Sequence, residues 1–60
     1  MGNFIKSNIG DGGKLDVQLW KEKGRFLVVT LSQYNNKIYK RRFNKYENAL
    51  DYYDKVLEEF

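Results

Sequence analysis

The chain has 60 residues, of which 42% are hydrophobic and 17% aromatic, and it carries a formal net charge of +3. This length gives one domain near the lower limit for independent folding. The absence of cysteine and histidine excludes disulfides and a cysteine/histidine zinc site, and it leaves no histidine to activate a nucleophile. We therefore expect no metal, no cofactor and no enzyme activity, and so short a chain leaves little room for a concave pocket.

Residues 1–13 (MGNFIKSNIGDGG) have no clear hydrophobic period. The glycine-rich run 10–13 breaks regular structure and lacks the spacing of a phosphate-binding loop. We predict that 1–13 is an N-terminal segment that is either flexible or adds a strand, and that 14–60 is a single domain. In a further alternative the segment folds back and covers one sheet face with its apolar side chains, Phe4, Ile5 and Ile9.

Three segments after Gly13 have the pattern of β-strands. Residues 14–20 alternate between apolar and polar side chains, which is the period of a half-buried strand. Residues 25–33 are rich in strand-forming residues and apolar on both faces, as in a central strand. Residues 37–43 are short and highly charged, which suits an edge strand because lysine and arginine discourage unwanted pairing. The sequence therefore predicts a three-stranded antiparallel sheet.

The lengths of the two hairpin loops decide which side chains share a face. Three-residue loops, 22–24 and 34–36, place Gly24 and Asn36 where a positive φ is needed, and both residue types tolerate it. This register gives the sheet one almost wholly apolar face, formed by Leu15, Val17, Leu19, Leu27, Val29 and Leu31. A shorter second loop would pair apolar residues with lysine and arginine, and a one-residue slip turns a whole strand over.

From residue 46 onward, apolar residues recur at three- and four-residue spacing, which predicts an amphipathic helix. The stripe consists of Tyr46, Ala49, Leu50, Tyr53, Val56, Leu57 and Phe60. Asn44 is a suitable N-cap, and Glu47 three residues later completes a capping box. The predicted fold is thus α+β, with the order β-β-β-α and one C-terminal helix packed on one face of the sheet.

The charges divide between the sheet and the helix. Ten Lys and Arg residues and three Asp and Glu residues precede Tyr46, a net charge of +7, whereas one Lys and five acidic residues follow, a net charge of −4. This asymmetry directs a nucleic-acid surface to the sheet and away from the helix. The basic run at 37–42 supports that interpretation, although edge-strand protection explains the same run equally well.

The sheet face opposite the helix is the candidate binding surface. The predicted site residues are Lys14, Gln18, Trp20, Arg25, Phe26, Thr30, Lys37, Lys40 and Arg42. Cations of this kind neutralise phosphates, while amide and hydroxyl groups contact bases or sugars and aromatic rings stack on unpaired bases. In the alternative interpretation the face binds protein, with Trp20, Phe26 and Arg42 as anchors.

The order of elements from Gly24 to Tyr53 also matches a known arrangement, in which a strand ends in phenylalanine, a cap residue follows and a helix begins. The residues that carry this resemblance are Phe43, Asn44, Glu47, Ala49, Tyr53 and Asp54. The stretch resembles the DNA-binding domains of plant ethylene-response-type factors and integrase N-terminal domains. Such domains bind double-stranded DNA through the open sheet face. The resemblance places near DNA the residues Trp20, Arg25, Thr30, Lys40 and Arg42.

We thus predict a small non-catalytic DNA-binding module, with double-stranded DNA as the expected partner. The alternative is an interaction protein of a phage or mobile element that binds or inhibits a host protein, and a homodimer is compatible with either. The abundance of Asn, Lys, Tyr and Ile without proline motivates the phage origin. No apolar run approaches the roughly 20 residues of a membrane span, so no membrane contact and a cytoplasmic location are expected.

Overall fold

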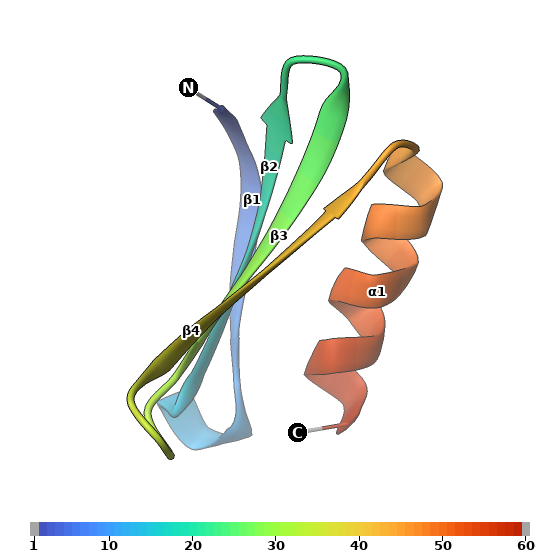
Figure 1. The fold of residues 1–60 in the computed structure, drawn as a ribbon. Helices are drawn as coiled ribbons and strands as arrows, with labels where there is room; N and C mark the ends of the chain where they lie inside the picture. The colour runs from blue at the N-terminus through green and yellow to red at the C-terminus, as the bar shows by residue number, and fades with distance from the viewer. Residues whose placement is uncertain (1, 60) are drawn as a thin grey trace.

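The computed structural model describes residues 2–59 and shows an antiparallel sheet covered on one face by a C-terminal helix (Figure 1). Within these residues the sheet has four strands in the order β1-β2-β3-β4. The elements are β1 (Asn3–Gly10), η1 (Asp11–Gly13), β2 (Leu15–Glu22), β3 (Arg25–Ser32), β4 (Lys37–Phe43) and α1 (Tyr46–Glu59). The α+β class with one C-terminal helix is confirmed, but the prediction of three strands was wrong.

The additional strand is β1, which pairs antiparallel with β2. Its register is interrupted between Phe4 and Lys6, so that Ile5 is an extra residue at a bulge. A bulge reverses the alternation of side chains beyond it, and Phe4 and Ile9 therefore point to the same face although five positions separate them. This is why the segment shows no hydrophobic period in the sequence. Both side chains lie at the edge of the uncovered face and extend it rather than cover it.

The central strand β3 is displaced by one residue from its predicted register. The β2–β3 loop has two residues, 23–24, and the β3–β4 loop has four, 33–36, instead of three in each. The positive φ angles predicted at Gly24 and Asn36 are confirmed, at 73° and 53°. Leu19 nevertheless pairs with Val28 rather than with Leu27, so β3 is turned over while β2 and β4 keep their predicted faces.

The displacement has a physical reason, because β3 is apolar on both sides and its hydrophobic pattern selects neither face. Val28 lies under the helix and is 1% exposed, whereas Leu27 and Val29 lie on the other face and are still only 8% exposed. Turn chemistry supports the longer second loop, since the Asn35 side-chain carbonyl accepts a hydrogen bond from the Lys37 backbone N–H at 3.3 Å. The geometry of the β3–β4 turn, rather than hydrophobic burial, therefore fixes the register of β3.

The main core lies between β2, β3 and α1. Among the described residues it comprises Leu15, Val17, Leu19, Val28, Ala49, Tyr53 and Val56. The predicted burial of the three β2 side chains and of Ala49, Tyr53 and Val56 in the helix stripe is confirmed, while Leu50 and Leu57 are partly buried and Tyr46 is exposed. Phe60, the last residue of the predicted stripe, lies outside the described residues. Among residues 2–59, no helix has both the length and the apolar character needed to cross a membrane.

The N-cap of the helix lies one residue later than predicted. The Ala49 backbone N–H donates to the Lys45 carbonyl at 3.2 Å, and the residue whose carbonyl accepts the first helical bond is the N-cap. That residue is Lys45, whose side chain cannot accept a hydrogen bond from the free N–H groups of the first turn. The predicted capping box of Asn44 and Glu47 was therefore wrong, because Asn44 lies one residue before the N-cap.

A better cap at position 45 should stabilise the protein. We expect Lys45→Ser to raise the free energy of unfolding by about 1 kcal/mol, because the serine hydroxyl can accept from a free N–H group of the first helical turn. Thermal or urea unfolding followed by circular dichroism measures this gain. Asn44→Ala serves as the control and should change stability by only a few tenths of a kcal/mol. A loss of about 1 kcal/mol in that control would instead make Asn44 the cap.

The buried Tyr53 makes stability sensitive to alkaline pH. Burial raises the pKa of its phenol above the ordinary value of 10.0, and the negative charges of Asp54 and Asp16 raise it further. The folded state therefore retains the proton more tightly than the unfolded chain. Its contribution to stability is complete below pH 10.0 and is lost as the pH rises through the folded pKa. Tyr53→Phe should flatten this alkaline decline in urea-unfolding measurements, whereas an unchanged decline would exclude Tyr53 as its source.

Candidate nucleic-acid interface

The sheet face that points away from α1, here called the open face, has three rows of side chains that run across all four strands, and Glu22 and Arg25 lie beyond them beside the β2–β3 loop. The first of the three rows contains Phe4, Trp20, Leu27 and Arg42, which are successive cross-strand partners. The Phe4 and Trp20 rings meet edge to face with centroids 5.3 Å apart, a favourable aromatic geometry. Phe4 is 54% exposed, so this aromatic row presents a ring to solvent on an edge strand.

Hydrogen bonds along β2 hold the polar part of the open face in place. The Trp20 indole N–H donates to Gln18 Oε1 at 3.0 Å, and Gln18 Nε2 reaches Asp16 Oδ2 at 3.5 Å. The indole has only one donor, and here that donor is already used. Trp20 therefore offers its ring rather than a polar group, and Gln18 is held with both ends of its amide engaged.

The row of the open face nearest the β3–β4 loop, here called the apolar row, is largely hydrophobic. It contains Ile9, Asp16, Leu31 and Ile38, again in cross-strand order. Ile9 and Ile38 at its two ends are 65% and 64% exposed. The displaced β3 also brings Leu27 and Val29 to this face, although each is only 8% exposed. The open face is therefore more apolar than the sequence predicted.

Positive charge on the open face comes mainly from the β4 edge. Lys40 and Arg42 lie in neighbouring rows of that strand, and Arg25 follows the β2–β3 loop opposite Glu22. The Arg42 Nε donates to Glu22 Oε1 at 2.9 Å. Such an exposed ion pair contributes at most about 1 kcal/mol to stability. It does orient the guanidinium beside the aromatic row, with half of the Arg42 side chain still accessible.

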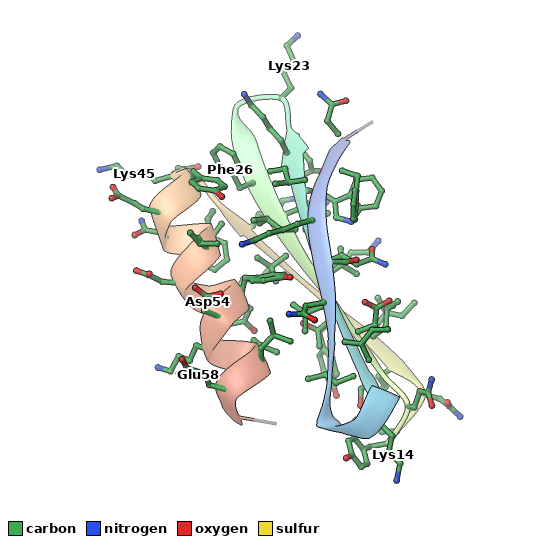
Figure 2. The ribbon with its side chains drawn as sticks, turned by 180° about the vertical axis from the view of Figure 1, so that it is seen from behind. Lys14, Lys23, Phe26, Lys45, Asp54 and Glu58 are labelled. Atoms are coloured by element: carbon green, nitrogen blue, oxygen red, sulfur yellow. The ribbon has the colours of Figure 1, made fainter. Side chains whose placement is uncertain are left out.

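The structure places most, but not all, of the predicted site residues together. Those on the open face are Gln18, Trp20, Arg25, Lys40 and Arg42. The placement of Phe26 and Thr30 there was wrong, because the displaced β3 turns both toward α1. Phe26 packs on Tyr46 with centroids 5.5 Å apart, and Figure 2 shows it between the sheet and the helix. Thr30 is 6% exposed in the core layer.

The remaining predicted residues, Lys14 and Lys37, lie at the far end of the sheet. Lys37 pairs with Ser32, so it belongs to the row next to the β3–β4 loop on the helix side. Lys14 precedes β2, at the end of the sheet opposite the loop that carries Lys23 (Figure 2). Both are therefore remote from the aromatic row. Conversely, Phe4 lies on this face but was not among the predicted site residues, because the bulge at Ile5 hides the alternation of β1.

A pocket lies on the helix side of the sheet, contrary to the expectation that the chain has little room for one. The helix crosses the sheet diagonally, from the end of β4 to β1, where the Leu57 side chain occupies the space beside Gly10. Toward the β3–β4 loop, β4 diverges from α1 (Figure 1). The part of the helix side that α1 does not cover holds a pocket of about 510 Å³, lined by Leu15, Thr30, Ser32, Tyr34, Asn35, Tyr39, Tyr52 and Val56.

Comparison with known proteins identifies no relative of this chain. No protein-family model, no curated protein and no solved structure matches the chain. The resemblance to plant ethylene-response-type and integrase N-terminal domains therefore stays a prediction. Within residues 2–59, the structure also shows no group of acidic side chains arranged to hold a metal ion.

Proposed function

We propose that the protein is a non-catalytic DNA-binding module of the cytoplasm that holds nucleic acid against its open face. The observation that carries this proposal is the aromatic row. It places an exposed phenylalanine and a tryptophan beside an oriented arginine, with Lys40 in the next row. Aromatic rings beside cations are the combination by which proteins hold unpaired bases and their phosphates.

The polar contacts favour binding without base specificity. A glutamine recognises adenine through its amide oxygen and amide N–H together, and in Gln18 one lone pair of the oxygen is used by Trp20 and one N–H reaches Asp16. Asp16 also places a negative charge in the apolar row. Stacking on Phe4 and Trp20 and phosphate contacts from β4 remain the available interactions. They favour a strand with unpaired bases over an intact duplex, because stacking needs an accessible base face.

The charge distribution supports the same orientation. The helix carries exposed carboxylates, among them Asp54 and Glu58, on the side of the molecule opposite the open face (Figure 2). These groups repel phosphates, whereas the lysines and arginines of β4 attract them. A nucleic acid approaching the molecule is therefore directed to the sheet, because its affinity depends mainly on phosphate neutralisation.

Chemical-shift mapping tests this proposal directly. Titration of ¹⁵N-labelled protein with a short oligonucleotide at low salt should shift the Trp20 indole resonance and the amides of β1, β2 and β4. The exposed amides of α1 should stay in place. The same experiment with single-stranded and duplex DNA of one sequence ranks the two partners. Unchanged spectra with both DNAs, or shifts confined to the helix, would rule out the open face as a DNA surface.

The apolar row favours a second candidate function, which is protein binding. Two isoleucines that are each about two-thirds exposed are a costly surface for a chain that binds only nucleic acid, since exposed apolar patches mark interaction sites. In this alternative the chain is an interaction protein of a phage or mobile element, bound to a host protein or to a second copy of itself. Ile38→Lys should then abolish partner capture while DNA affinity is unchanged or increases. A capture assay unaffected by this change would count against the alternative.

A further inference from the structure

The pocket between α1 and the β3–β4 hairpin has the lining of a site for a flat aromatic ring. The side chains of Tyr34, Tyr39 and Tyr52 contribute to its walls, and Leu15 and Val56 are its aliphatic residues. Its volume of about 510 Å³ lies within the roughly 300–1,000 Å³ that is usual for small-molecule sites. Aromatic and aliphatic walls of this kind exclude water from the faces of a planar ring.

Polar groups in the lining are suited to the edge of such a ring. The Asn35 amide donates to the Tyr39 hydroxyl oxygen at 2.8 Å, so the Tyr39 hydroxyl hydrogen remains a donor. Asn35 is itself held through the bond from Lys37, which fixes this donor in place. Thr30 is a buried polar residue on the helix side and brings a hydroxyl group into the lining of the pocket. Its position in the lining gives that hydroxyl access to a ligand.

Positive charge flanks the pocket on two sides. The Arg41 guanidinium lies 5.0 Å from the centroid of the Tyr52 ring, and the Lys14 ammonium lies 5.5 Å from that of Tyr34. The side chains that line the pocket are themselves neutral. A ligand that matches this arrangement has a neutral ring with hydrogen-bonding groups at its edge and an anionic group outside the pocket. A purely aliphatic ligand would leave the hydroxyls unpaired, and a neutral sugar would leave the cations unused.

We propose that this pocket binds a nucleotide, with the base between the tyrosines and a phosphate at Arg41 or Lys14. A free nucleotide and the end of a single DNA strand both present a base with a phosphate, so both are candidate ligands of the pocket. The site is on the opposite side of the sheet from the aromatic row and does not depend on the proposed function. Binding in the pocket and binding on the open face can therefore be tested separately.

The experiment is an NMR titration of the full chain with adenosine 5′-monophosphate, adenosine, inorganic phosphate and a short 5′-phosphorylated oligodeoxyadenylate. Saturable shifts centred on Thr30, Ser32 and Tyr39 are expected with the monophosphate. Adenosine should bind at the same place more weakly, and phosphate alone should not reproduce the shifts. A stronger response to the oligonucleotide than to the monophosphate at these residues identifies a strand end as the source of the base.

Substitutions in the pocket distinguish binding of the base from binding of the phosphate. Tyr34→Ala, at an exposed loop position, should weaken the monophosphate at least fivefold because one stacking surface is lost. Either Arg41→Ala or Lys14→Ala, whichever removes the cation that holds the phosphate, should weaken the monophosphate but leave adenosine unchanged, and Trp20→Ala on the open face should alter neither. The proposal is overturned if no probe shifts the pocket residues at millimolar concentration. It is equally overturned if inorganic phosphate produces the same shifts, or if Tyr34→Ala binds as tightly as the unmodified chain.

Discussion

Leu19→Ala is expected to be largely unfolded at 25 °C. Leu19 is fully buried between the sheet and α1, and truncation of such a side chain costs about 2–5 kcal/mol through lost burial and the cavity that remains. A chain of this size gains only about 3–5 kcal/mol from its core. The chain has no cysteine and so no disulfide that would limit the loss. Circular dichroism and urea unfolding measure the effect.

Leu31→Ala is the matched control, since it makes the same chemical change on the other side of the sheet. In the structure Leu31 is half-buried on the open face, opposite Asp16 and Ile38. Its truncation should therefore cost clearly less than that of Leu19, and the variant should remain folded. The register predicted from the sequence places Leu31 under the helix, where both variants would lose similar stability. Equal losses would thus contradict the observed register.

Trp20→Ala should weaken DNA binding by roughly 5- to 150-fold, which corresponds to the loss of about 1–3 kcal/mol of base stacking. The change also removes the partner of the Phe4 ring, so both rings of the aromatic row are affected. Fluorescence anisotropy of a labelled oligonucleotide measures the affinity, and circular dichroism verifies that the variant is folded. Trp20→Phe retains a stacking surface and should recover part of the affinity.

An aromatic residue on the helix side provides the control for this experiment. Tyr46 is exposed and packs on Phe26 at the start of α1, away from the open face. Tyr46→Ala should bind the oligonucleotide as the unmodified chain does. If Trp20→Ala retains full affinity, or if Tyr46→Ala loses as much, stacking on the aromatic row is not the basis of binding.

Sequence patterns predicted those parts of the fold in which one face is apolar and the other polar. The alternation in β2 predicted its buried residues correctly, and the stripe in α1 did so for Ala49, Tyr53 and Val56, because only one orientation of each element buries its apolar side. In β3 both orientations bury apolar residues, so the outcome depended on one residue in each loop. The orientation of β3 is selected by the two-residue loop of Lys23 and Gly24 and by the hydrogen bond at Asn35. The hydrophobic pattern of β3 does not select it.

The candidate site was predictable to the extent that it lies on β2 and β4. Trp20, Lys40 and Arg42 keep their predicted face because their strands keep theirs. Phe26 and Thr30 moved to the helix side with β3, and β1 was not assigned firmly because a bulge breaks its period. The pocket follows from the diagonal course of α1 across a twisted sheet, which no local pattern in the sequence encodes.

The most direct test of the account uses Trp20 itself, which is the chain's only tryptophan and lies in the aromatic row. Its fluorescence is followed while single-stranded DNA is added at several salt concentrations. We predict a saturable change in emission, with an association constant that falls with salt by a log–log slope of about −0.7 for each phosphate contacted. Emission that stays unchanged at low salt, with single-stranded and with duplex DNA, would contradict the assignment of the open face as a DNA-binding surface.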